Sequence, residues 1–444
     1  MRRHRIPHLV LFAIAAGWAS AAAAAPARAE RPSADAVAPT QAGSAAIALA
    51  IQEEAGGALK RFYAERDFRP LWAPGGKIGR SAGTLIGFLE TAELDGLNPS
   101  SYGIQDLREA VAAARGGDPR AIARAELELS DAFARYVRDQ RKGGVKMIYA
   151  DKKLKPKRPK VENVLRTAAF PKSFDDYVTD MGWMSQHYVR LRQLAARAQK
   201  QGVSEEVMAR LHLNLDRARL LPGPWTHHVV VDASSGRLWY YGQGKQAGTM
   251  RVVVGAKETQ TPMLVGTLQW AILNPYWNVP TYLARNSIAP KVLAGRSLAS
   301  LKMEALSDWS TSPRKLAASE IDWPAVAAGD QELRLRELPG AHNSMGRVKF
   351  LFPNEEGIYL HDTPERDLLK KPDRHFSNGC IRLEDAAALG RWLLQKPLPR
   401  ASKAVEQAVP LPVQVPVYLT YITAAATDSG VAFRDDVYGR DGEE

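Results

Sequence analysis

The spacing of apolar residues changes once along this 444-residue chain, and that change divides it into two parts. Before residue 221, apolar side chains recur at helical intervals, as at positions 85, 88, 89 and 92. Residues 221–224, Leu-Pro-Gly-Pro, then break the chain. After this break the apolar residues form short strand-like runs between turn residues, beginning with 228–232 and 237–241. The predicted fold class is therefore α+β, with a mostly helical N-terminal domain followed by a β-rich domain.

Five segments are expected. Residues 1–29 combine a basic start, an apolar run and an Ala-Arg-Ala cleavage site, which is typical of a secretory signal peptide; an uncleaved membrane anchor is the alternative. Residues 30–44 are predicted to be a flexible leader because they lack periodicity. The remaining predicted segments are the helical domain (45–221), the β-rich domain (225–424) and a C-terminal tail (425–444).

A long, mostly helical insertion is predicted at about residues 281–341, inside the β-rich domain. An insertion of this size in a sheet domain commonly acts as a lid or a substrate-binding flap. In the last strand-like run, 413–422, Pro416 favours a position at a sheet edge.

The formal net charge is +12 and the isoelectric point is near 9.6, which favours acidic surroundings. Export makes nucleic acid an unsuitable partner, and the sequence has no zinc-finger spacing, Walker loop or aromatic RNA-binding motif. The basic run 146–160 is either a solvated loop or a contact for an anionic polymer of the cell envelope.

The sequence has a single cysteine, Cys380. In an oxidising compartment one cysteine cannot form a disulfide within its own chain, which leaves an intermolecular crosslink, an inert buried thiol or a nucleophile. The neighbouring residues favour the nucleophile. Gly379 lets the backbone approach a substrate closely, and His361 stands upstream at the end of an apolar run.

A thiol attacks a carbonyl group as its thiolate, so the site needs a lowered thiol pKa and a base. His361 is the candidate base, and its imidazole could be oriented by Asp362 or equally by a backbone carbonyl. The N–H of Cys380, together with a neighbouring N–H, could form an oxyanion hole. The positive charge of Arg382 near the thiol favours the thiolate.

Other hydrolytic chemistries lack their sequence signatures. There is no HxxxH or CxxC pattern for a metal, and no G-x-S-x-G for a serine nucleophile. Papain-like and NlpC-like peptidases place the cysteine before the histidine, whereas no histidine follows Cys380 here.

These residues resemble a known family. His361 followed by residues 377–382, Ser-Asn-Gly-Cys-Ile-Arg, is similar to the active-site signature of the L,D-transpeptidases (YkuD-type catalytic domain), in which a histidine and a loop precede S-H-G-C-x-R. Further segments resemble the large periplasmic YcbB-like branch of Gram-negative bacteria: 261–262, 339–350, 352–354 and 358–364 for the catalytic domain, and 68–72 and 95–99 for its scaffold domain.

The chain departs from the family pattern in two places. Asn378 stands where the signature usually has histidine. In addition, the repeat-like pattern of the small peptidoglycan-binding module that such enzymes often carry is not found between residues 168 and 220.

The resemblance implies acyl transfer between peptidoglycan stem peptides in the periplasm. Cys380 would attack the carbonyl of the third residue of a donor tetrapeptide and release the terminal D-alanine. The thioester would then pass to the side-chain amine of an acceptor stem and form a 3→3 crosslink. No cofactor and no metal is implied, and carbapenem β-lactams are the expected covalent inhibitors.

The resemblance also implies roles for neighbouring residues. His361 would deprotonate the thiol and later the incoming amine, while Gly379 belongs to the catalytic loop. The supporting residues are Tyr359, which lines the site, Ser377, which fixes the loop, and Arg382, which holds an acidic group of the donor or stabilises the loop. Asn378 and Asp362 complete the predicted set.

Three alternatives stay open on the sequence. Water as the acceptor would make the protein an L,D-carboxypeptidase or a crosslink-cleaving hydrolase. A protein amine as the acceptor would make it an enzyme that tethers a protein to the wall. A non-catalytic wall-binding scaffold is the alternative from another class.

Overall fold

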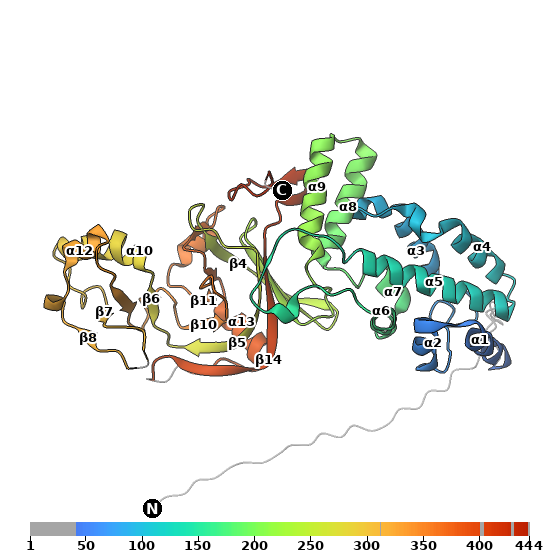
Figure 1. Cartoon of the computed structure of the whole chain (residues 1–444), viewed down its shortest axis with the longest axis horizontal. Helices are drawn as coiled ribbons and strands as arrows, with labels where there is room; N and C mark the ends of the chain where they lie inside the picture. Colours follow the sequence, from blue (N-terminus) through green and yellow to red (C-terminus); the bar gives the residue numbers. More distant parts are fainter. Residues whose placement is uncertain (1–40, 311, 400–403, 428–429, 443–444) are drawn as a thin grey trace, which may run out of the picture.

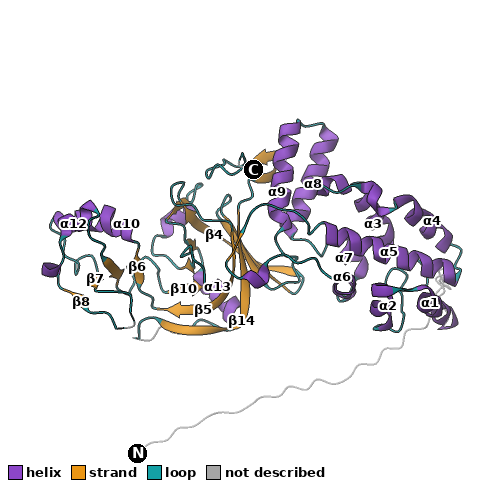
Figure 2. Ribbon diagram, in the orientation of Figure 1, coloured by secondary structure: helices purple, strands orange, loops and turns teal. Residues whose placement is uncertain are grey.

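A computed structural model describes residues 41–310, 312–399, 404–427 and 430–442. Helices occupy one end of the molecule, a β-rich part lies in the middle, and a small mixed subdomain lies at the other end (Figures 1 and 2). The predicted α+β class, with helices first and strands second, is confirmed. The predicted signal peptide, 1–29, lies outside the described residues. The predicted leader ends earlier than residue 44, because helix α1 already begins at Gln41.

The helical domain is an assembly of nine α-helices among the described residues. They are α1 (Gln41–Glu54), α2 (Gly57–Ala64), α3 (Arg80–Glu90), α4 (Ile104–Ala114), α5 (Pro119–Asp139), α6 (Val161–Ala169), α7 (Phe174–Thr179), α8 (Gln186–Gln201) and α9 (Glu205–Arg219), with 3-10 turns η1 (Ala92–Asp95), η2 (Pro99–Tyr102) and η3 (Lys152–Leu154). Ser204 caps α9, since its side chain accepts a hydrogen bond from the Val207 N–H.

Two buried carboxylates join the loops of this domain to its helices. Glu126 on α5 accepts hydrogen bonds from the N–H groups of Leu71 and Trp72 and from the Tyr63 hydroxyl. Asp95 accepts hydrogen bonds from the Tyr136 hydroxyl of α5 and the Tyr188 hydroxyl of α8, and it forms an ion pair with Arg192 of α8. The segments 68–72 and 95–99 are therefore held by buried, satisfied polar groups.

The β-rich domain is a sheet whose pairings close on themselves. Its strands follow the circuit β5 (Leu264–Leu273), β10 (Val348–Leu351), β11 (Leu360–His361), β13 (Ile381–Leu383), β4 (Lys245–Gly255), β3 (Arg237–Gly242), β2 (His228–Asp232) and β14 (Gln407–Thr420). Strand β14 pairs with β2 in parallel and with β5 in antiparallel, which completes the ring. Strand β14 is therefore not an edge strand at residues 417–419, which have partners on both sides, whereas Pro416 itself is paired only with Thr267 of β5.

Two further strands join this sheet, β1 (Ile148–Tyr149) beside β5 and β12 (His375–Ser377) beside β4. Alternate residues of a strand point to opposite faces. On β2, Val229 and Val231 belong to a core enclosed by the sheet and helix α13 (Ala386–Leu394). Val230 belongs instead to the core of the helical domain, together with Tyr418 on β14. The two domains therefore share one apolar core.

The insertion occupies the chain between β5 and β10 and has a small core of its own. Its regular elements are β6 (Trp277–Val279), α10 (Thr281–Leu283), the π-helical turn η4 (Ala284–Ile288), α11 (Ala289–Leu293), β7 (Met303–Leu306), β8 (Lys315–Leu316), the 3-10 turn η5 (Ala318–Glu320), α12 (Trp323–Ala328) and β9 (Arg334–Glu337). The prediction of a mostly helical insertion is incomplete, because four of its strands form a separate sheet in the order β6-β9-β7-β8.

The segment predicted as a C-terminal tail is folded over its described residues, and this prediction is wrong. Strands β15 (Ala424–Thr427) and β16 (Gly430–Phe433) pair as an antiparallel hairpin. The following chain returns to α9, where Asp441 pairs with Arg210 and Arg217, and the Tyr438 side chain is buried. Among the described helices, none has the length and apolar character needed to cross a membrane.

Candidate active site

Strands β11 and β13 bring four of the predicted residues to one face of the sheet. They pair in parallel, with Leu360 opposite Ile381 and His361 opposite Arg382. The pairing continues one residue upstream, since the Ile381 N–H donates to the Tyr359 carbonyl. Leu360 and Ile381 point into the buried core. Because side chains alternate along a strand, Tyr359, His361, Cys380 and Arg382 share the opposite face.

Cys380 is a half-buried residue, and its thiol is held by the backbone around Tyr359. Its sulfur lies 3.5 Å from the Gly357 carbonyl oxygen. Burial raises the pKa of the thiol to about 11, while the N–H and O–H donors of Tyr359 and the charge of Arg382 oppose that shift. The expected thiolate-favouring effect of Arg382 is therefore present but smaller than the effect of burial.

His361 is buried, and its orientation is set by the backbone. Its Nδ1 lies 2.6 Å from the Asp362 carbonyl oxygen, so Nδ1 carries the proton and Nε2 keeps its lone pair. Burial first, and then the charges of Arg382 and Lys349, lower the pKa of His361 to about 3, while the hydrogen bond to the Asp362 backbone opposes the shift. The imidazole is therefore neutral at physiological pH and can accept a proton through Nε2.

The carboxylate of Asp362 does not face the imidazole and serves a different part of the site. It accepts a hydrogen bond from the Arg347 N–H at 2.9 Å and forms an ion pair with Arg366. Of the two orienting groups considered from the sequence, the backbone carbonyl is the one that contacts His361. Arg382 in turn forms an ion pair with Glu365 beside the site.

The loop before Cys380 is fixed by Ser377. The buried Ser377 hydroxyl donates to the Cys380 carbonyl at 2.6 Å and accepts from the Gly379 N–H at 3.2 Å. Gly379 has φ of +104°, a conformation that L side chains rarely adopt. Asn378 is exposed, and within the described chain its side chain makes no hydrogen bond.

The N–H of Cys380 has no acceptor among the described residues, whereas the Gly379 N–H is already bonded to Ser377. Cys380 therefore supplies one free donor beside its own sulfur, which is the arrangement needed to stabilise a developing oxyanion.

Two residues that the sequence did not single out also belong to the site. Tyr282 of the insertion lies near the thiol, since burial first and the negative charge of a Cys380 thiolate second raise its pKa. Thr261, quoted above only as part of a resembling segment, donates from its hydroxyl to the Gly379 carbonyl at 2.7 Å. Both residues are far from Cys380 in the sequence, so no local sequence pattern pointed to them.

The closed sheet, the thiol and the buried neutral imidazole define a cysteine site suited to acyl transfer. Comparison with known families agrees with that class: the family model of the L,D-transpeptidase catalytic domain matches residues 226–415, and a scaffold-domain model matches residues 57–194. Residues 226–415 therefore match an L,D-transpeptidase catalytic domain.

A curated relative covers most of the chain. It is a Haemophilus influenzae protein, itself named only as a candidate L,D-transpeptidase, that is 25% identical over 396 residues, 86% of this chain and 78% of its own length.

Solved structures give weaker matches. A Mycobacterium smegmatis L,D-transpeptidase is 14% identical with a TM-score of 0.20, over 44% of this chain and 58% of its own. An Enterococcus faecium L,D-transpeptidase, a cysteine-to-serine mutant, is 12% identical with a TM-score of 0.19, over 55% of this chain and 89% of its own. Similarities this low carry no argument about the present chain.

Proposed function

We propose that this protein is a periplasmic peptidoglycan L,D-transpeptidase that forms 3→3 crosslinks through a thioester on Cys380. The single observation that carries the proposal is the shared face of β11 and β13. There an L,D-transpeptidase catalytic domain presents the thiol of Cys380, the free Nε2 of His361 and the unbonded N–H of Cys380 together.

The reaction starts from a neutral thiol. Because the thiol pKa is raised to about 11, the proton leaves the sulfur as the sulfur attacks the carbonyl of the third residue of a donor tetrapeptide. Nε2 of His361 accepts that proton, and the Cys380 N–H stabilises the oxyanion. The proton then passes to the leaving amine, D-alanine departs, and the acyl group remains on sulfur.

The second half-reaction repeats these steps in the opposite sense. The side-chain amine of an acceptor stem attacks the thioester, His361 takes a proton from that amine, and it returns this proton to the Cys380 sulfur as the sulfur leaves. One amide bond is broken and one is formed, so the free energies of the two bonds nearly cancel and the reaction requires neither ATP nor a metal. The insertion borders the site, because its Tyr282 lies near the thiol.

Location and partners are part of the proposal. The N-terminal sequence supports export to the periplasm, where stem peptides are the available donors and acceptors. The resemblance of several segments to the YcbB-like branch supports the same assignment, and carbapenems are proposed as covalent inhibitors of Cys380.

The test is to incubate the mature protein with disaccharide-tetrapeptide and to identify the products by mass spectrometry. We expect a crosslinked dimer together with released D-alanine, and a covalent carbapenem adduct on Cys380. Formation of tripeptide without dimer would instead indicate carboxypeptidase activity. Neither product nor adduct would leave the non-catalytic scaffold as the better description.

Matched variants assign the roles of the two residues. Cys380→Ala is expected to remove both the products and the adduct, because no other thiol exists in the chain. His361→Gln is expected to slow both half-reactions by about 10²–10⁴-fold, the usual contribution of a general base. The control is His342→Gln, at an exposed histidine of the insertion loop, which should retain wild-type rates.

A further inference from the structure

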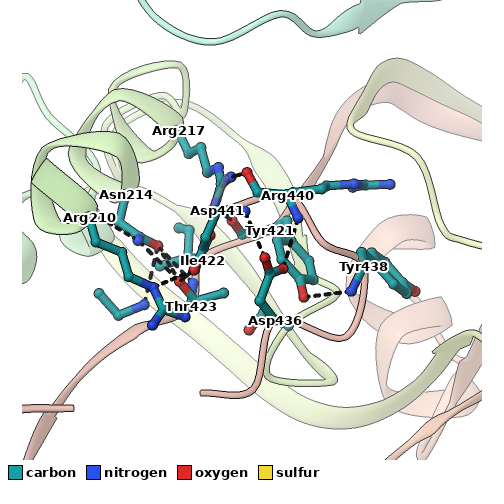
Figure 3. Close-up of polar contacts among 12 residues, drawn as sticks. Arg210, Asn214, Arg217, Tyr421, Ile422, Thr423, Asp436, Tyr438, Arg440 and Asp441 are labelled. Atoms are coloured by element: carbon teal, nitrogen blue, oxygen red, sulfur yellow. Dashed lines mark hydrogen bonds and ion pairs between the residues drawn. The ribbon is translucent and has the colours of Figure 1, made fainter. Parts of the chain in front are cut away.

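The end of the chain contacts the loop that supports Cys380. After the β15–β16 hairpin, residues 436–441, here called the C-terminal clasp, pass between helix α9 and the loop 256–261. Figure 3 shows this cluster, with Arg217 on one side and Tyr438 on the other. Polar contacts hold one end of the clasp to the helical domain and the other end to the loop 256–261.

One end of the clasp is attached to the helical domain. The Asp441 carboxylate forms ion pairs at 2.6 Å with both Arg210 and Arg217 of α9. The Arg217 side chain is only 3% exposed, and it also donates to the carbonyls of Tyr421 and Arg440. Because these partners are buried together, the attachment is specific in geometry and is costly to break.

The other end holds the loop 256–261. The Tyr438 ring stacks on Tyr421, with centroids 5.0 Å apart. Its hydroxyl donates to the Gly255 carbonyl at 2.7 Å and accepts from the Thr261 N–H at 3.3 Å. Arg440 donates to the side-chain oxygen of Gln260 and to the Thr261 carbonyl, at 2.8 and 3.1 Å. Thr261 is thus held through both its N–H and its carbonyl.

Thr261 passes this constraint to the catalytic loop. It is fully buried, and its hydroxyl accepts from the Gly255 N–H at 2.9 Å and donates to the Gly379 carbonyl at 2.7 Å. The Gly379 carbonyl and the Cys380 N–H belong to the same peptide unit. In a planar trans peptide these two groups point in opposite directions, so fixing one fixes the other.

We propose that Thr261 and Tyr438 are positioning residues that aim the Cys380 N–H at the oxyanion, and that the C-terminal clasp holds them in place. The proposal rests on the proposed function, because it concerns the oxyanion of that acyl transfer. A glycine at position 379 makes such a restraint necessary, since its backbone can rotate through conformations closed to other residues. The clasp also connects the orientation of this donor to helix α9.

The experiment compares carbapenem acylation of Cys380 in full-length Thr261→Val, Thr261→Ser and Tyr438→Phe, followed by mass spectrometry at several inhibitor concentrations. Thr261→Val removes the hydroxyl but keeps the branched shape, and we expect the maximal acylation rate to fall about 10–100-fold, less than the roughly 10²–10³-fold for loss of an oxyanion donor. The concentration giving half-maximal rate should change little. Thr261→Ser, which keeps the hydroxyl, should restore most of the rate.

Tyr438→Phe guards against a simple folding defect, because it keeps the stacking on Tyr421 and removes only the hydroxyl. It should lower the maximal rate in the same way with a nearly unchanged melting temperature. The control is Tyr241→Phe, a buried tyrosine of the same domain whose hydroxyl has no hydrogen-bond partner among the described residues.

Wild-type acylation rates in both Thr261→Val and Tyr438→Phe would overturn the inference and leave the proposed function intact. So would a loss of rate in Thr261→Val that Thr261→Ser does not restore. If the wild-type protein forms neither adduct nor crosslinked product, the proposed function fails, and the inference fails with it.

Discussion

At the scale of single residues, the site is characterised by two neutral groups rather than by an ion pair. Burial raises the pKa of Cys380 to about 11 and lowers that of His361 to about 3. Between these two values the thiol keeps its proton and the imidazole lacks one. The nucleophile is therefore activated when the substrate carbonyl arrives, and the resting thiol is protected from side reactions that require a thiolate.

The protonation state of the thiol can be measured directly. We expect the thiolate absorbance, taken as wild type minus Cys380→Ser, to appear with a midpoint near pH 11. The sign follows from the raised pKa, because the folded protein keeps the thiol proton to a more alkaline pH than an exposed cysteine does. A midpoint below about pH 7, the region of activated cysteines, would contradict the burial argument.

At the scale of elements, helix α8 packs against strand β3 through His187. Its ring lies 4.6 Å from that of Trp239, and neither ring nitrogen has a partner among the described residues. Burial lowers the pKa of His187 to about 3, and Arg190, His228 and Arg434 add to the shift. The contact between the two domains therefore requires a neutral imidazole.

Replacing that imidazole should make the protein less sensitive to acid. The unfolded chain binds a proton near the ordinary pKa of 6.5, whereas the folded chain binds it near 3. The contribution of His187 to stability is thus fully present above about pH 6.5 and is lost as pH falls, by up to about 1.4 kcal/mol per pH unit. His187→Phe should lose less of its urea-unfolding free energy between pH 7 and pH 5.

The control for this measurement is His342→Gln, because this histidine is exposed on the insertion and lies outside the contact between the helical and β-rich domains. Its unfolding free energy should follow the wild-type dependence on pH. Equal pH slopes for His187→Phe and wild type would show that His187 takes up its proton at its ordinary pKa in the folded protein.

At the scale of the whole molecule, the helical and β-rich domains are joined by a continuous apolar core. Val230, Val265 and Tyr418 of the β-rich domain pack into the same cluster as the scaffold helices. The C-terminal clasp adds buried ion pairs across the same contact. Separating the domains would expose this surface to water, at about 25 cal/mol for each Å² of apolar area.

The two domains should therefore unfold together. Calorimetry of residues 41–444 is expected to show one cooperative transition for both, because neither buries its share of the core alone. Residues 225–444 expressed without the helices should have a lower melting temperature and a greater tendency to aggregate. Two well-separated transitions, with the isolated β-rich domain as stable as in the full chain, would contradict the shared core.

The sequence by itself determined features that depend on nearby residues. Apolar spacing and the Leu-Pro-Gly-Pro break at 221–224 predicted helices followed by strands, and β2 has the predicted bounds, His228–Asp232. The lone Cys380, preceded by Gly379 and with His361 upstream, was sufficient to indicate the chemistry. Periodicity and backbone freedom are local properties, so the order of residues carries them.

Only the tertiary structure decided the features that depend on contacts between distant segments. It closed the ring of strands through β14, folded the predicted tail into a clasp, and brought Thr261 to the Gly379 carbonyl. It also reversed the expected shift of the Cys380 pKa. Burial depends on everything packed around a group, and it outweighed the charge of Arg382, the only contribution visible in the sequence.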